Sequence, residues 1–262
     1  AAIEAARHKR SVIVVTKKQR TECNSFYAQG GIAAALSEHD TPEAHILDTL
    51  TVGCGLSDPA VVETVVREGA ERVRELLEWG APFDRVGRRL SFGLEGGHST
   101  ARVLHRGDET GAMLERELLR HVRSRILEDC FALDLVTARG ACWGAVVSHP
   151  KKGLVWVRAR GTVLATGGLG QIYRETTNPA VATGDGLAMA WRAGAELMDM
   201  EFMQFHPTTL YLAGASRALT TTAARVQSSA KASAESATAT LRPSASLAVQ
   251  PTASQRTPSR RP

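Results

Sequence analysis

The stretch Ser25–Ala35 constrains the fold of this chain most, because its adjacent glycines, Gly30 and Gly31, lead into a small, helix-favouring run, Ile32–Ala35. A backbone without Cβ atoms can approach a ligand closely, and the amides that open a helix can bind an anion or a polar ring edge. The stretch begins about ten residues after the hydrophobic run Val12–Val15. A strand, a loop and a helix in this order predict a doubly wound α/β nucleotide site. A simple turn is the alternative.

The positive charge of the chain is concentrated near its C-terminus. The net charge is +5 over 262 residues, but residues 216–262 hold seven Lys or Arg and one Glu, which leaves residues 1–215 at −1. The same segment has no Gly and no aromatic residue, so it cannot bury enough apolar surface to offset the entropy of ordering. We expect a domain over residues 1–215 and a low-complexity, disordered tail over residues 216–262. Without aromatic residues to stack on bases, the tail predicts no nucleic-acid partner.

Membrane and disulfide classes are disfavoured by the sequence. No apolar run reaches the roughly 18 residues that cross a bilayer, and no charged-then-apolar leader opens the chain. The expectation is a soluble, cytoplasmic protein with no membrane partner. The four cysteines, at positions 23, 54, 130 and 142, form no C-x-x-C pair and have no histidine at ligand spacing. This pattern predicts reduced thiols, with neither a zinc site nor a disulfide framework.

Apolar periodicity and turn residues predict the order of the elements. Thr41-Pro42 and Ser57-Asp58-Pro59 have the cap and first-turn residues of helix starts, and Met113 is expected to fill the core. The expected helices cover residues 1–7, a short stretch from residue 41, 57–80, 110–127 and 187–193. The expected strands cover residues 11–16, 131–136, 141–147, 154–158 and 161–165, with a strand-like run at 202–205.

Five ordered motifs carry a resemblance to a known family. They are Asn24–Gly31, Glu95–Ser99, Ala165–Gly168, Thr183–Ala190 and Glu201–Thr208. Together they resemble the L-aspartate oxidases and their relatives, the succinate dehydrogenase and fumarate reductase flavoproteins. The resemblance implies a doubly wound, Rossmann-like FAD-binding domain that is interrupted by a small β-meander insertion at about residues 131–158.

The resemblance also implies where FAD binds. Asn24 resembles the position at which succinate dehydrogenases have a histidine that bonds covalently to the flavin. An amide cannot make that bond, so a non-covalent FAD is expected. Asp185 has two readings, a contact to a hydroxyl of the flavin nucleotide or a helix cap. The implied cofactor-binding residues are Lys17, Asn24, Ser25, Phe26, Tyr27, Ala28, Gln29, Gly30, Gly31, Ala132, Gly167, Gly168 and Asp185.

Two residues resemble the family's catalytic positions. Glu95 resembles the Glu with which aspartate oxidases could pair the substrate's α-ammonium group, although Leu94 stands where a basic neighbour is usual. His206, in His-Pro-Thr, resembles the histidine that binds a substrate carboxylate. The implied reaction transfers hydride from Cα of L-aspartate to flavin N5. The resemblance also implies oxygen or fumarate as the electron acceptor. It further implies coupling to quinolinate synthase in de novo NAD biosynthesis.

Several alternatives and departures from the family remain open. The chain can also be a succinate- or fumarate-type flavoprotein, which Asn24 and Glu95 disfavour, or a non-catalytic binding fragment with a basic tail. No G-x-G-x-x-G turn precedes residues 11–16; we expect truncation upstream, a missing capping domain after His206, and weak FAD binding by the chain as given. Beyond about Arg225 the composition changes abruptly, which predicts a frame-shifted translation; a true disordered tail is the alternative.

Overall fold

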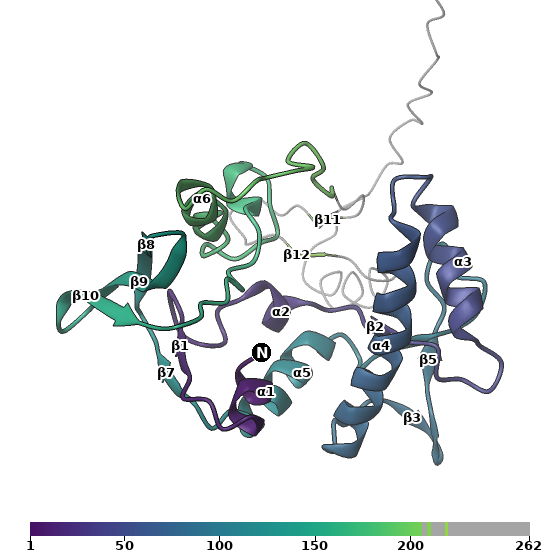
Figure 1. Cartoon of the computed structure of the whole chain (residues 1–262). Coiled ribbons are helices and arrows are strands. Elements are labelled where there is room, and N and C mark those ends of the chain that lie inside the picture. The colour runs from purple at the N-terminus through teal and green to yellow at the C-terminus, as the bar shows by residue number, and fades with distance from the viewer. Residues whose placement is uncertain (206–208, 211–217, 220–262) are drawn as a thin grey trace, which may run out of the picture. The chain divides into compact units, whose positions relative to one another are not determined.

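The computed structural model describes residues 1–205, 209–210 and 218–219 (Figure 1). The chain divides into two units, Ala1–Thr221 and Thr222–Pro262, and every described residue belongs to the first. His206 lies outside the described residues. So does the predicted tail, including the predicted change of reading frame, apart from Ala218–Leu219.

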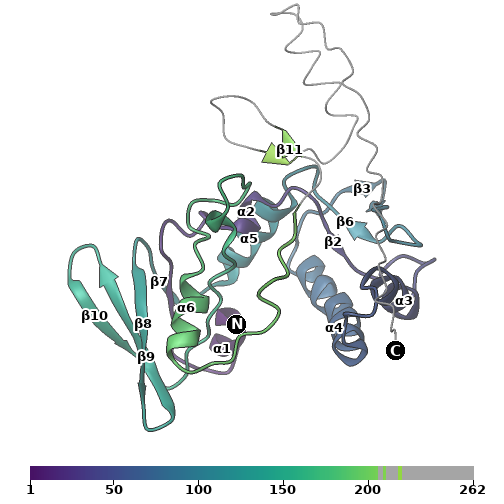
Figure 2. The same ribbon diagram turned by 90° about the horizontal axis from the view of Figure 1, so that it is seen from above.

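The described residues form short helices and five small sheets (Figure 2). The helices are α1 (Ala2–Arg7), α2 (Asn24–Tyr27), α3 (Pro42–Val52), α4 (Pro59–Glu78), α5 (Thr110–His121) and α6 (Asp185–Arg192), with a 3-10 turn at Gly170–Ile172. The strands are β1 (Ile13–Val15), β2 (Ile32–Ala33), β3 (Arg85–Val86), β4 (Arg89–Leu90), β5 (Phe92–Gly93), β6 (Val103–Leu104), β7 (Arg125–Leu127), β8 (Phe131–Ala138), β9 (Ala141–His149), β10 (Gly153–Arg158), β11 (Thr209–Leu210) and β12 (Ala218–Leu219).

The sheets pair mostly neighbours along the chain. The strand orders are β1-β7, β2-β6-β5, β3-β4, β10-β9-β8 and β11-β12, and of these the β1-β7 pair is parallel. The antiparallel sheet β8–β10 is the predicted meander, and its three strands are confirmed to within two residues at each end. Its strand β8 lies beside α6 (Figure 2).

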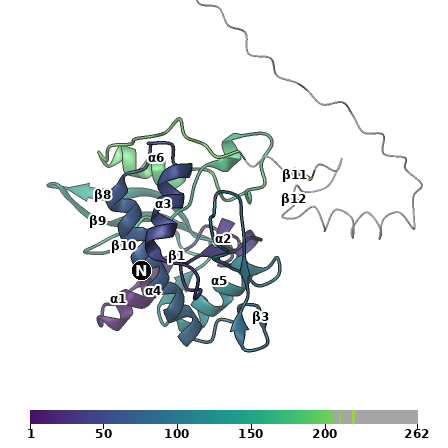
Figure 3. The same cartoon turned by 90° about the vertical axis from the view of Figure 1, so that its right-hand side faces the viewer.

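Caps fix the starts of the two adjacent helices α3 and α4 (Figure 3). Thr41 Oγ1 accepts a hydrogen bond from the Ala44 N–H at 3.1 Å, and Pro42 occupies the first turn. Asp58 Oδ1 accepts from the N–H groups of Ala60 and Val61. These caps satisfy amides that have no partner inside the helix. Both predicted helix starts are confirmed.

The main core lies where α4 and α5 pack against β2 and β6. Leu104 is fully buried, Val73 is 1% exposed and Met113 is 6% exposed, so the expectation that Met113 fills the core is confirmed. The full cluster is Ala34, Val73, Ala81, Phe83, Leu104 and Met113. Burial of such side chains contributes about 1.5–3 kcal/mol each for the larger ones.

Two helix predictions are wrong. The predicted helix 110–127 ends at His121, and Arg125–Leu127 instead form β7, because Ile13–Val15 offer it a parallel partner strand. The helix expected after Gly31 is strand β2, which pairs with β6, and Ala34 beyond it is 1% exposed in the core. Tertiary pairing therefore overrides the helix propensity of the alanine run.

Two strand predictions are also wrong. Residues 161–165 belong to no strand and are exposed, with Val163 at 73%. Among the described residues no strand lies alongside to accept their hydrogen bonds, and a strand needs such a partner. Residues 202–205 form no strand either, and Phe205 is 69% exposed. Elsewhere, none of the helices in the described part of the chain is long and apolar enough to cross a membrane, and all four cysteines are free thiols.

Candidate functional site

The loop Asn24–Gly31, called the flavin loop below, is held by close backbone packing on both sides. The Gly111 N–H at the start of α5 donates to the Ala28 carbonyl oxygen at 2.9 Å. A Cβ at Gly111 would collide with the carbonyl oxygen of Ser25, and one at Gly31 would collide with the carbonyl oxygen of Leu104. Both glycines are therefore required by close approach. The sequence reasoning missed Gly111, because its role depends on contacts with Ser25 and Ala28 that a single sequence does not reveal.

Part of the flavin loop is open to solvent, and one of its buried polar atoms has no partner among the described residues. Asn24, Tyr27 and Gly30 are exposed, while Phe26 and Gln29 are half-buried. Gln29 Oε1 is buried and has no hydrogen-bond partner among the described residues. A buried acceptor without a partner is costly, so this amide fits a ligand that donates a hydrogen bond to it.

The turn Ala165–Gly168 packs against the start of α6. The Gly184 N–H donates to the Gly168 carbonyl oxygen at 3.2 Å. A Cβ at Gly186 would collide with the Thr166 side chain. Gly184 has φ of 77°, which favours glycine. The motifs Ala165–Gly168 and Thr183–Ala190, which lie apart in the sequence, are therefore packed against each other.

The flavin loop also lies close to the turn Ala165–Gly168. Gly167 has φ of 69°, and a Cβ built on it would lie 4.0 Å from Asn24 Nδ2. The amide of Asn24 therefore faces the turn at Gly167. Three of the five motifs thus meet in one place.

Lys17 joins the end of the β1 strand to α6. Its Nζ lies 2.6 Å from Asp185 Oδ2 and 2.5 Å from Thr183 Oγ1, and 5.1 Å from the centre of the Phe131 ring. Burial opposes ionisation of Asp185, but hydrogen bonds from Lys17 and Thr183 outweigh it and lower the pKa of that carboxyl. The carboxylate is therefore charged at neutral pH.

The alternative reading of Asp185 as a helix cap is wrong. Gly184 occupies the N-cap of α6, and the cap makes no side-chain hydrogen bond. Asp185 is the first helical residue, with its carboxylate turned to Lys17 and Thr183. Ala132 lies on β8, where it pairs with Val147 of β9. It follows Phe131, whose ring lies against Lys17, so Ala132 is close to the residues around Asp185.

Glu95 lies away from this group. Strands β2 and β5 run in the same direction on the two sides of β6. Gly31 precedes β2 and Glu95 follows β5, so the two residues lie toward opposite ends of this sheet. Glu95 is exposed, and no described residue pairs with its carboxylate. His206, the other predicted catalytic residue, is outside the described residues.

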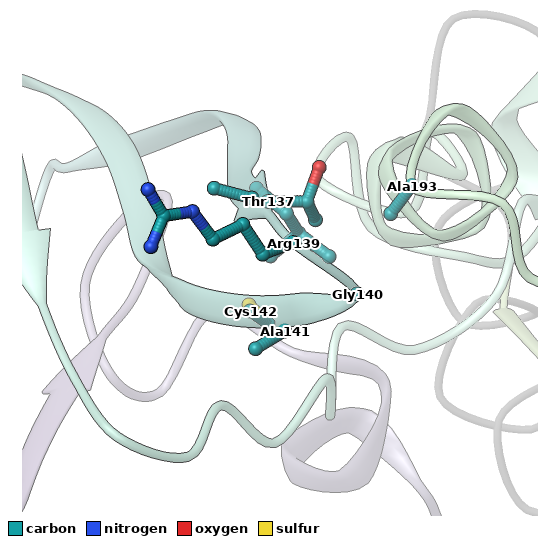
Figure 4. A pocket seen from close by; sticks show the side chains of 8 residues that line it. Thr137, Arg139, Gly140, Ala141, Cys142 and Ala193 are labelled. Atoms are coloured by element: carbon teal, nitrogen blue, oxygen red, sulfur yellow. The ribbon is translucent and has the colours of Figure 1, made fainter.

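Two hollows lie near these elements. The larger lies at the turn between β8 and β9 and is lined by residues that include Thr137, Cys142 and Ala193 at the end of α6, while the Arg139 side chain extends away from Ala193 (Figure 4). No predicted site residue lines it. A smaller hollow of about 280 Å³ is lined by Lys17, Lys18, Gln19, Glu22, Ala180 and Val181. The smaller hollow is the one that contains Lys17, the partner of Asp185.

A comparison with protein families identifies the fold. The model of the FAD binding domain family matches residues 1–237 of the 262. The chain belongs to the FAD-binding domain family. Its cofactor is FAD, and the predicted fold class, the FAD-binding domain of this flavoprotein superfamily, is confirmed.

Curated relatives of this FAD-binding chain are L-aspartate oxidases. The protein from Nostoc sp. is 44% identical over 218 residues, which cover 81% of this chain and 38% of the relative. The protein from Bacillus subtilis is 47% identical over 219 residues, covering 82% of this chain and 41% of the relative. The chain therefore spans about two fifths of the length of the curated relatives it matches. The predicted resemblance is confirmed.

Solved structures agree on the superfamily. A variant of the quinol fumarate reductase subunit FrdA of E. coli has a TM-score of 0.78 at 31% identity, covering 84% of this chain and 38% of that one. The Sdh1 complex of Mycobacterium smegmatis has a TM-score of 0.75 at 33% identity, covering 79% and 39%.

The residues present fit FAD. Gln29 presents a buried acceptor with no partner among the described residues. Gly30 and Gly167 present exposed backbone without Cβ atoms, and Lys17 holds a charged Asp185. Polar ring edges, hydroxyl groups and phosphates are the chemistry that such donors and acceptors bind.

Proposed function

We propose that this chain is the FAD-binding part of an enzyme that oxidises L-aspartate to iminoaspartate. The observation that carries the proposal is the 44–47% identity to L-aspartate oxidases over about four fifths of the chain. Matches to fumarate reductase and Sdh1 structures are at 31–33%. A dehydrogenase of succinate or fumarate type is therefore the second candidate, supported by the TM-scores of 0.75–0.78.

In this proposal the residues of the chain bind and orient the substrate and the cofactor. FAD, when bound, would supply the capacity to take up a hydride from Cα of the substrate. Asp185, held in its charged form by Lys17, accepts hydrogen bonds from nucleotide hydroxyls. Gln29 and the amides of Gly30 and Gly31 contact polar edges of the ring. The other contacts come from Ser25, Phe26, Tyr27, Ala28, Ala132, Gly167 and Gly168.

Asn24 supports a dissociable cofactor. Its amide lies against Gly167, at the position that resembles the flavin-linking histidine of succinate dehydrogenases, and an amide nitrogen is not a nucleophile for that bond. Denaturation in trichloroacetic acid should therefore leave all flavin in the supernatant. Flavin that stays with the precipitated protein would contradict a non-covalent site.

The substrate contacts of this proposal are Glu95, which pairs with the α-ammonium group, and His206, which donates to a carboxylate. The partners and setting belong to it as well: oxygen or fumarate as acceptor, coupling to quinolinate synthase, and a cytoplasmic location. The proposed domain is residues 1–215. The Glu95 carboxylate is exposed and has no ion-pair partner among the described residues, which supports its role in meeting a cation.

The test uses a full-length chimera, in which the matched residues of this chain replace their counterparts in the Bacillus subtilis relative. The chimera should oxidise L-aspartate, and Glu95→Gln should raise KM for L-aspartate about tenfold while fumarate reduction changes less, because fumarate has no amine. Glu71→Gln, an exposed carboxylate on α4, is the control. Equal losses on both substrates would remove Glu95 from the ammonium site, and oxidation of succinate but not of L-aspartate would favour the second candidate.

A further inference from the structure

A buried ion network lies beneath the loop Leu94–Ala101, called the Glu95 loop below. Arg102 is fully buried, and its Nε and Nη2 donate to the two oxygens of Asp40, each at 2.9 Å. Arg102 Nη1 donates to Asp48 Oδ2 at 2.7 Å. The Asp40 side chain is completely buried and that of Asp48 is 14% exposed. Charges are this deeply buried only when they are paired and hydrogen-bonded.

Asp48 connects the network to the Glu95 loop. Its Oδ2 also accepts hydrogen bonds from the Ser99 N–H and from Ser99 Oγ, both at 2.8 Å. These bonds, first that of the Ser99 N–H and then those of Ser99 Oγ and Arg102, lower the pKa of Asp48. One carboxylate oxygen therefore ties a buried guanidinium to a residue four positions after Glu95.

The rest of the Glu95 loop is shaped around this tie. The His98 N–H donates to the Glu95 carbonyl oxygen at 3.2 Å, which closes a turn. Gly97 has φ of 84° and lies directly against Val52 of α3, where a Cβ would come within 2.7 Å of Val52 Cγ2. The loop thus rests on α3, the helix that carries Asp48.

The backbone of Arg102 links this loop to the strand that follows the flavin loop. Its N–H donates to the Gly93 carbonyl oxygen at 3.1 Å, at the end of β5 just before the Glu95 loop. Its carbonyl oxygen accepts from the Ala34 N–H at 3.0 Å, three residues after Gly31. The Arg102 backbone therefore bonds both to the segment that leads into the Glu95 loop and to the segment that follows the flavin loop.

From these contacts we propose that Asp48 and Arg102 are positioning residues, which hold the Glu95 loop in place so that the enzyme selects an amino dicarboxylate over one without an amine. The inference rests on the proposed function. Neither residue touches substrate in this account; each acts through Ser99 and the backbone to place the Glu95 carboxylate. Without the tie the Glu95 loop samples other conformations, and the enzyme loses the ammonium contact but keeps the carboxylate contacts.

The first test measures the loop itself. Hydrogen exchange of the 262-residue chain is compared with that of Asp48→Ala and of a matched control, Asp84→Ala. Asp84 also accepts from an arginine (Arg106 Nη1, 3.1 Å) and a backbone amide (Gly107 N–H, 2.6 Å), but it braces a different loop. Asp48→Ala should speed exchange at residues 94–101 about tenfold or more while α4 stays protected, and Asp84→Ala should leave 94–101 unchanged. Unchanged exchange in Asp48→Ala, or equal loosening by both variants, would overturn the proposal.

The second test measures selectivity in the full-length chimera. Asp48→Ala and the milder Ser99→Ala should raise KM for L-aspartate, by about tenfold for Asp48→Ala, with a much smaller change for fumarate. Asp84→Ala should change the two substrates equally. A purely structural role would lower the amount of active enzyme and leave the ratio of the two KM values constant, which contradicts the proposal. If the unmutated chimera oxidises no L-aspartate, the proposed function fails, and the exchange experiment still decides whether Asp48 holds the loop.

Discussion

Residues 32–121 contain a buried hydrophobic cluster, whereas residues 159–205 bury few apolar side chains, although both regions also expose some. In the first region Leu104 is fully buried and Val73 is 1% exposed. In the second, Val163, Trp191 and Phe205 are each more than 65% exposed, although Met189 of α6 is buried. The first region, called the core region, has its own interior. The second, called the glycine-turn region, leaves most of its large apolar side chains exposed.

The comparison separates what stabilises the chain from what binds the cofactor. The core region supplies helix caps, the hydrophobic cluster and the buried Arg102 network. The glycine-turn region supplies Gly167 and Asp185, whose contacts are mostly backbone packing and exposed polar bonds. Mutations in the first should therefore lower the free energy of unfolding, and mutations in the second should lower cofactor affinity with little effect on stability.

The largest expected loss of stability comes from Arg102→Ala. It leaves the completely buried Asp40 carboxylate without its bidentate partner, and an unpaired buried charge costs about 3–5 kcal/mol. Urea unfolding followed by circular dichroism measures it. Arg192→Ala is the control, because Arg192 pairs with Asp134 at the surface and such a pair is worth about 0–1 kcal/mol. Equal losses in the two variants would erase the distinction between the regions.

Leu104→Ala should come next. It empties a fully buried position in the main core, which typically costs about 2–5 kcal/mol through lost burial and the remaining cavity. The same urea titration gives the value. A loss below about 1 kcal/mol would mean that the core region is less tightly packed than its burial indicates.

A smaller, pH-dependent effect is expected at the loop after β1. Side-chain hydrogen bonds from Arg20, followed by its backbone N–H, lower the pKa of Glu128 to about 2. A lowered folded-state pKa stabilises the fold above the unfolded value of about 4.3, and this contribution is lost as pH falls from there to about 2. The urea midpoint of the wild type should therefore exceed that of Glu128→Gln at pH 6, and the difference should shrink steadily as pH falls from about 4.3 to about 2. A constant difference would show that the carboxylate's charge is not responsible.

Trp191→Ser should have the smallest effect. The side chain is 67% exposed on α6, so its removal should change the free energy of unfolding by no more than about 0.5 kcal/mol. A loss of 2 kcal/mol or more in urea unfolding would show that this face of α6 is covered in solution.

The sequence predicted the parts of the fold that local chemistry determines. Thr41-Pro42 and Asp58-Pro59 gave correct helix starts, because a cap acts within a few residues. The meander followed from alternating patterns and turns. The predictions failed where a distant partner decides: Ile32–Ala33 became a strand because β6 lies beside them, and residues 161–165 lack the ladder that their pattern predicted.

The candidate site shows the same division. The resemblance predicted Lys17, the flavin loop, Gly167 and Asp185 as cofactor-binding residues. In the structure Lys17 contacts Asp185, and Asn24 of the flavin loop lies near Gly167. No pattern indicated Gly111, whose role depends on contact with Ser25 and Ala28, or the Asp48–Arg102 tie across 54 positions. Both depend on contacts between residues that are far apart in the sequence, and a single sequence does not reveal such contacts.

The most direct test of the central claim is an FAD titration of the full-length chimera, followed by flavin fluorescence, with and without Asp185→Ala. If the glycine-turn region binds the nucleotide through this carboxylate, Kd should rise about tenfold or more, the value of a hydrogen bond to a charged group, while urea stability changes by less than about 1 kcal/mol. Asp84→Ala, a carboxylate in the core region, should leave Kd unchanged. An unchanged Kd for Asp185→Ala would contradict the assignment of this site to FAD.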